Sequence, residues 1–87
     1  MLSQETIEWL LRDEYSIYME YMPEMEIKVD GDMQKFDSEF RLHIEAFQFE
    51  IKDVVEIVSR IEKEGWKFCH MEGGRHKVSL VFTRGDD

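Results

Sequence analysis

One stretch of this chain, residues 40–83, is patterned as a strand, a helix and a hairpin, and its most distinctive part is the helix predicted over Asp53–Gly65. Asp53 and Glu56 have the spacing of a capping box, in which each side chain accepts a hydrogen bond from the other residue's backbone N–H. Gly65 stands where a helix that ends in a left-handed residue needs a glycine. The apolar residues of this segment that share one side of a helix are Val54, Ile57, Val58 and Ile61. The spacing therefore predicts an amphipathic helix that packs along one side.

The segment after this helix predicts a β-hairpin closed at Gly73-Gly74. Its alternating residues are Trp66, Phe68 and His70 before the glycines and Val78, Leu80 and Phe82 after them. A two-residue Gly-Gly turn would place Lys67 opposite the apolar Leu80, so we predict a three-residue loop with a glycine in the left-handed conformation. Arg84–Asp87 then reads as a frayed tail.

Residues 1–22 predict a short helix, followed by a second element whose type the pattern leaves open. Ser3 has the side chain of a helix N-cap, and Leu2 and Ile7 are spaced as a hydrophobic staple across it. Tyr15–Met22 alternates as a strand does, but it also continues the helical spacing. Because Tyr and Ile favour strands, we predict a strand there, with a helix as the alternative.

Two further strands are predicted before the central helix, one over Glu24–Asp30 and one that begins near Asp37. The side chains predicted to face the core are Met25, Ile27 and Val29 in the first and Phe40, Leu42, Ile44 and Ala46 in the second. A register in which the numbers of paired residues add up to 67 places Lys28 opposite Glu39 and leaves a six-residue loop, Gly31–Phe36. Opposite charges across a strand pair stabilise it, so we predict this register.

After Ala46 the apolar side of the pattern changes, and Phe47, Phe49 and Ile51 continue it in the other phase. A β-bulge explains such a change. A strand end that is covered on both faces explains it equally well, and the pattern leaves both alternatives open.

Together these segments predict one α+β domain over residues 1–87. We expect two helices packed on a mainly antiparallel sheet of about five or six strands, in the order helix, strands, helix, C-terminal hairpin. The pattern does not predict the oligomeric state.

The net charge of the chain limits the kinds of partner that it can bind. Lys and Arg number 11 and Asp and Glu number 20, so the net charge is −9, which repels phosphate backbones and disfavours nucleic acid. A single cysteine, Cys69, suits a reducing cytoplasm, and no signal peptide or membrane-spanning segment is patterned in the sequence. The abundance of charged residues resembles that of thermophile proteins.

Three aspartates form the best candidate for a cofactor or metal site. Asp30, Asp32 and Asp37 lie in or beside the predicted loop, and clustered carboxylates in a flexible loop are the ligands that Ca²⁺ prefers. Asp30 and Asp32 have the spacing that opens an EF-hand loop, although the remaining ligand positions of that loop do not follow. We therefore predict divalent-cation binding, with Ca²⁺ as the best specific candidate and solvated turn residues as the alternative.

A protein-interaction module is the alternative function. Tyr and Met are common at interfaces, and a domain of this size cannot bury all of those between Tyr15 and Met25. The residues of this predicted surface are Tyr15, Tyr18, Met19, Tyr21, Met22 and Met25. Given the acidic chain, we expect such a surface to dock a basic protein.

The remaining reactive side chains do not predict an enzyme. His43, His70 and His76 invite a zinc site, but Cys69, the obvious fourth ligand, would point away from His70, because neighbours on a strand lie on opposite faces. The same alternation argues against a Cys69–His70 catalytic pair. We find no nucleophile elbow, phosphate loop or metalloprotease motif, and so we expect a non-enzymatic binding protein.

Overall fold

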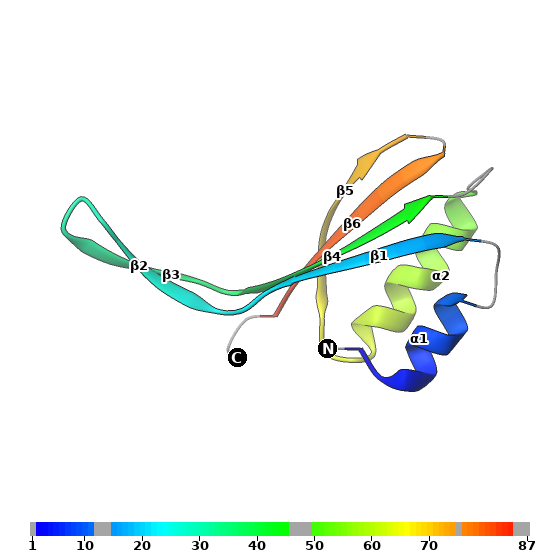
Figure 1. The fold of residues 1–87 in the computed structure, drawn as a ribbon, viewed down its shortest axis with the longest axis horizontal. Helices are drawn as coiled ribbons and strands as arrows, with labels where there is room; N and C mark the ends of the chain where they lie inside the picture. The colour runs from blue at the N-terminus through cyan, green and yellow to red at the C-terminus, as the bar shows by residue number, and fades with distance from the viewer. Residues whose placement is uncertain (1, 12–14, 46–49, 75, 85–87) are drawn as a thin grey trace.

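The computed structural model describes residues 2–11, 15–45, 50–74 and 76–84. Within these ranges it contains two helices and six strands (Figure 1). Their bounds are α1 Gln4–Leu11, β1 Ser16–Met22, β2 Met25–Val29, β3 Asp32–Phe36, β4 Ser38–Glu45, α2 Ile51–Glu62, β5 Lys67–Gly73 and β6 Lys77–Arg84. The predicted α+β class and the order of the elements are confirmed, and the predicted strand at Tyr15–Met22 is β1.

Four of the strands form an antiparallel sheet in the order β1-β4-β6-β5, and β2 and β3 form a separate pair. Both helices lie against one face of the four-stranded sheet, while β2 and β3 project away from them (Figure 1). α1 contacts β1 and α2 contacts β5, so each helix covers one half of the sheet. Neither of the two helices described lies on the opposite face, which we call the open face (Figure 1).

The core is built around β4 and β6, the two inner strands. Phe40, Leu42 and Ile44 of β4 pair directly with apolar residues of β6, and all of these side chains are at most 4% exposed. The β6 partners in these pairs are Phe82, Leu80 and Val78. Burying an apolar side chain of this size stabilises the fold by roughly 1.5–3 kcal/mol. The alternation predicted for residues 40–44 and 78–82 therefore specifies the centre of the sheet.

β1 and β4 continue into β2 and β3 in one unbroken register. Tyr21 pairs with Phe40 and Met25 pairs with Phe36, and the numbers of the partners add up to 61 in both sheets. Pro23, which has no N–H to donate to a ladder, stands at the interruption between β1 and β2. Ser16–Glu45 is thus one long hairpin in which the ladder is interrupted near Pro23 but the register stays the same on both sides of the interruption.

The predicted register of 67 and the predicted loop Gly31–Phe36 are wrong. The hairpin closes in two residues, Asp30 and Gly31, whose φ angles of 52° and 88° fit a type I′ turn. That turn fixes the pairing of Val29 with Asp32, and a charge pair worth ~0.5–1 kcal/mol does not override it. The predicted inward side is wrong too, because Met25, Ile27 and Val29 are exposed.

Both helix starts carry caps. The Thr6 N–H donates to the hydroxyl of Ser3, so the predicted cap of α1 is confirmed. The capping box of α2 lies three residues earlier than predicted, with Glu50 as the N-cap and Asp53 at the third helical position. The Glu50 N–H donates to Asp53 Oδ2 at 3.3 Å, and Ile51 and Lys52 adopt helical conformation before Asp53.

The predicted three-residue loop that includes both glycines is wrong, because Gly73 belongs to β5 and pairs with Val78. Phe68 lies opposite Phe82, as the predicted pairing requires. The register then shifts by one at Cys69, so the numbers of the paired residues beside the loop add up to 151, whereas a three-residue loop requires an even sum. The predicted glycine with a positive φ is confirmed at Gly73, whose φ is 109°.

Arg84 is not part of a tail. It ends β6, and its guanidinium donates to the carbonyl oxygens of Glu64 (2.6 Å) and Gly65 (3.4 Å), just after α2. The same guanidinium stacks on the ring of the buried Trp66, 4.4 Å from the ring centroid. Arg84 therefore satisfies carbonyls at the end of α2, which have no partner within the helix.

The change of phase predicted at Ala46 and Phe47 lies outside the described residues.

We expect Gly73→Ala to destabilise the protein by about 1–3 kcal/mol, because a Cβ at Gly73 would lie 2.2 Å from the Lys77 carbonyl oxygen and φ is positive. The matched control is Gly74→Ala, since a Cβ there meets nothing within 4 Å. Urea unfolding of both variants measures the difference. Equal stabilities for the two variants would contradict this account of the hairpin.

The acid stability of the protein is expected to depend on Glu64, whose Oε1 accepts the Ser3 N–H at 2.6 Å and so ties α1 to the end of α2. Burial raises the pKa of Glu64, but the Thr6 hydroxyl and the Ser3 amide and hydroxyl outweigh it, so the pKa lies below its ordinary value. The resulting stability is complete above the unfolded pKa of about 4.3 and is lost as the pH falls through the folded pKa.

Urea unfolding at a series of pH values measures this contribution. The Glu64→Gln variant should lose less stability than the wild type as the pH falls below about 4. Parallel losses in the two proteins would show that Glu64 does not contribute.

Candidate functional site

The structure does not bring the three predicted calcium ligands together. Asp30 lies in the turn between β2 and β3, and Asp32 begins β3. Asp37 follows the other end of β3, roughly 16 Å from Asp32 along an extended strand. Within the part of the chain that the structure describes, no group of three or more His, Cys, Asp or Glu side chains is arranged to hold a metal ion. Calcium binding stays a prediction from the sequence, without a described set of ligands.

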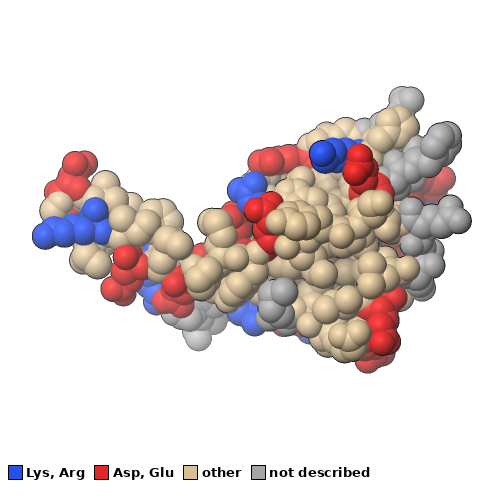
Figure 2. Space-filling model, viewed as in Figure 1, with Lys and Arg blue, Asp and Glu red and all other residues tan. Residues whose placement is uncertain are grey.

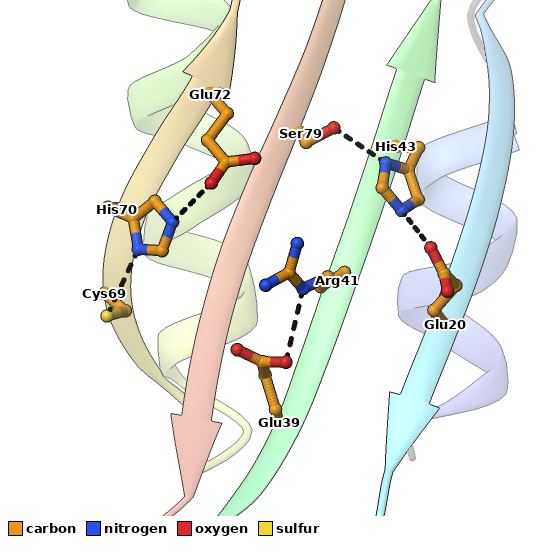
Figure 3. Close-up of polar contacts among 8 residues, drawn as sticks. All are labelled: Glu20, Glu39, Arg41, His43, Cys69, His70, Glu72 and Ser79. Atoms are coloured by element: carbon orange, nitrogen blue, oxygen red, sulfur yellow. Dashed lines mark hydrogen bonds and ion pairs between the residues drawn. The ribbon is translucent and has the colours of Figure 1, made fainter.

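The open face of the sheet carries a hydrogen-bonded row across three strands (Figure 3). His43 of β4 contacts Ser79 Oγ of β6 through Nδ1, at 2.7 Å, and Glu20 Oε1 of β1 through Nε2, at 2.5 Å. Tyr18, which pairs directly with His43, stacks on its ring. Glu20 accepts and the Ser79 hydroxyl can donate, so the neutral ring with its proton on Nε2 satisfies both contacts.

Arg41 occupies the next position of β4 on the same face. Its Nε donates to Glu39 Oε2 at 3.2 Å, and this hydrogen bond and charge raise the pKa of Arg41, with smaller contributions from Glu72 and Glu20. Three carboxylates, those of Glu39, Glu72 and Glu20, therefore act on one guanidinium at this face. The site is a polar surface on the sheet rather than an enclosed cavity, although a shallow hollow lies beside Glu20 and His43.

The prediction that Cys69 points away from His70 is wrong. The bulge at Cys69 breaks the alternation of β5, and His70 Nδ1 lies 3.4 Å from Cys69 Sγ (Figure 3). His70 Nε2 lies 3.0 Å from Glu72 Oε1. Sequence alternation alone cannot predict this contact, because it depends on the bulge.

The order Ser79, His43, Glu20 resembles a nucleophile, a base and an orienting carboxylate. Acyl transfer also requires donors aimed at the developing oxyanion. β6 lies between β4 and β5, so its backbone amides are directed into ladders on both sides and are not free to form an oxyanion hole. The row is therefore best understood as a contact that joins β1, β4 and β6.

The second surface is the hairpin extension, residues 23–37, which we call the ribbon arm. All ten residues of β2 and β3 are exposed. One face of the arm continues the core face of β1 and β4, because the register is unbroken. The apolar side chains of that face, 38% to 45% exposed, are Met25, Ile27, Val29 and Phe36. We call these four residues the apolar stripe.

The other face of the ribbon arm is mixed. It carries Lys28 opposite Met33 and Glu26 opposite Lys35, and Lys35 forms an ion pair with Glu24 at 2.9 Å. Residues 23–37 contain five acidic and two basic side chains, so the arm is acidic overall. In Figure 2 the charged side chains of the arm are separated by uncharged surface, and that surface continues towards the sheet.

The structure divides the predicted Tyr/Met surface. Tyr15 and Met19 are partly buried and pack against the core. Tyr18, Tyr21 and Met22 are exposed, and Met25 belongs to the apolar stripe. The exposed part of the predicted surface therefore leads from β1 onto the ribbon arm.

Comparison of the chain with protein-family models, with curated protein sequences and with solved structures finds no match. None of the helices described is long and apolar enough to cross a membrane. The function is therefore argued from the two surfaces themselves.

The contact between His43 and Ser79 is tested by Ser79→Ala. Removing the hydroxyl leaves Nδ1 of a half-buried histidine without its donor, and we expect a loss of about 1 kcal/mol in the free energy of unfolding. Ser79→Thr retains a hydroxyl and should restore most of it. Equal losses in the two variants would contradict the assigned contact.

Proposed function

We propose that this protein is an interaction module that docks a basic partner through its ribbon arm. The observation that carries the proposal is the apolar stripe, which continues the core face of the sheet beyond the end of the core. Nothing in the described parts of the chain covers it. Exposed apolar surface with a charged rim is typical of protein-interaction sites.

The architecture of the ribbon arm supports the same proposal. A two-stranded hairpin without a core is marginally stable in water. In this chain the arm is held by the long hairpin register and by its type I′ turn, and it buries none of its own residues. A partner that covers the stripe would supply the apolar contacts that the two helices supply to the main sheet.

The charge of the arm indicates the chemistry of the partner. The five carboxylates and two lysines of residues 23–37 lie on a chain of net charge −9. A basic rim around an apolar groove complements that distribution, speeds association and makes the complex sensitive to salt.

A random peptide display library tests the proposal, because it does not require that the partner be identified first. We expect the protein to select peptides that combine Lys or Arg with apolar residues, and their binding to weaken as salt is raised. The first comparison is a shortened arm, in which Asn-Gly replaces residues 26–35. Met25 and Phe36 then flank a two-residue turn in the same ladder phase as Val29 and Asp32 do in the native arm.

The second comparison separates the two faces of the arm. Ile27→Thr with Val29→Thr makes the stripe polar and keeps residues that favour strands, and we expect at least about tenfold weaker peptide binding. The control, Met33→Thr, makes the same kind of change on the opposite face. Selected peptides that bind the shortened arm as well as the wild type, or a failure to enrich any peptide, would overturn the proposal.

A further inference from the structure

The two outer edges of the four-stranded sheet differ in how well they resist pairing with another chain. The edge strand β5 is interrupted by the bulge at Cys69 and carries Lys67 and Glu72. The other edge strand, β1, pairs with β4 in an unbroken register over its seven residues. It contains no proline or lysine, and Glu20 is its one charged residue. Bulges, prolines and charges are the features that keep edge strands from pairing, so β1 is the unprotected edge.

The residues directly after β1 do carry features that keep a strand from pairing with another chain. Pro23 cannot donate to a ladder, and β2 carries Glu26 and Lys28. The pairing-competent edge is therefore confined to Ser16–Met22. Pairing there would leave the ribbon arm outside the interface.

We propose that β1 pairs antiparallel with β1 of a second copy of this chain, which joins the two main sheets into one. This inference goes beyond the proposed partner of the ribbon arm and does not depend on it. The dimer would carry two arms that project in opposite directions, because the paired strands run in opposite directions. Two arms would allow bivalent binding.

The sequence of β1 is self-complementary in this arrangement. A two-fold axis perpendicular to the sheet keeps each face on its own side, so opposed residues come from the same face. Complete overlap of Ser16–Met22 places Met19 on the axis and Ile17 opposite Tyr21 of the second copy. It also places Tyr18 opposite the second Glu20, so a phenol meets each carboxylate. A slip by one pleat in one direction would oppose the two Glu20 side chains, and a slip in the other direction would oppose the two Tyr18 side chains and place Glu20 opposite Ser16, without the contact between phenol and carboxylate.

The helix layer is compatible with the same partner. α1 is the helix that contacts β1, and both copies of α1 would lie on the same side of the joined sheet. Leu11, the last residue of α1, is 58% exposed. A second copy beside this edge offers apolar surface in the same layer, which a soluble peptide added to β1 would not.

Sedimentation over a wide range of protein concentrations measures the association, and single cysteines locate it in a Cys69→Ser background. Met19→Cys should form a disulfide-linked dimer, because opposed Cα atoms in an antiparallel pair lie within disulfide range. Ile17→Cys and Tyr21→Cys should link together in the double variant but not singly. Glu62→Cys on α2 is the exposed control. A monomer at every concentration, or linking that is equal at all positions, would overturn the proposal.

A charge pair on one exposed residue gives a second measurement. Tyr18 is 65% exposed, so Tyr18→Glu and Tyr18→Lys should both leave the monomer folded, which circular dichroism checks. Glu at this position opposes Glu20 twice in the dimer and should weaken dimerisation by about 5- to 30-fold. Lys there opposes Glu20 favourably and should not weaken it. Equal effects of the two substitutions would contradict the pairing, whatever the ribbon arm binds.

Discussion

The structure depends on the burial of one strand pair, β4 with β6. Phe40 against Phe82, Leu42 against Leu80 and Ile44 against Val78 form successive apolar pairs in the middle of the sheet. The helices are arranged around them: Ile57 and Ile61 of α2 and Leu10 of α1 join the same buried cluster. The edge strands β1 and β5 pair directly with these two strands, so the main sheet and both helices depend on them.

This dependence explains why some elements are predictable. The C-terminal hairpin and α2 carry their apolar residues at spacings set by contact with the core, and those spacings are visible in the sequence. The cap at Ser3 and the glycines at Gly65 and Gly73 reflect local backbone chemistry, which is also visible. The predicted cap of α2 is wrong by three residues because Glu50 and Asp53 form the same kind of reciprocal contact earlier in the chain.

The errors have several physical causes. Alternation over residues 24–30 predicts burial of one side only if the strand lies on the core, because alternation alone shows no more than that a strand has two different faces. The pair Asp30-Gly31 carries a stronger signal for the register, a two-residue turn, than the charge pairs that favour a register of 67. The row of Glu20, His43 and Ser79 cannot be predicted from the sequence pattern, because it depends on the order of three strands in the sheet. The contact of Cys69 with His70 depends on a bulge.

The ribbon arm and the edge of β1 are the two places where surface remains that the core does not use. Both follow from the long hairpin Ser16–Glu45: its first part forms an edge of the sheet, and its second part leaves the sheet altogether. The open face between them is occupied by polar contacts that its own strands satisfy. We propose that the arm and the edge of β1 recognise partners, while the middle of the sheet provides the stability.

The ribbon arm is ordered without belonging to the core, and native-state hydrogen exchange distinguishes this arrangement from an arm that is part of the core. In the free protein, amides in the β4–β6 ladder should exchange only through global unfolding, with a strong dependence on added urea. Amides in the β2–β3 ladder should exchange much faster, through local opening that depends little on urea. If the amides of β2 and β3 are as well protected as those of β4 and β6, the arm is part of the core and unfolds together with it.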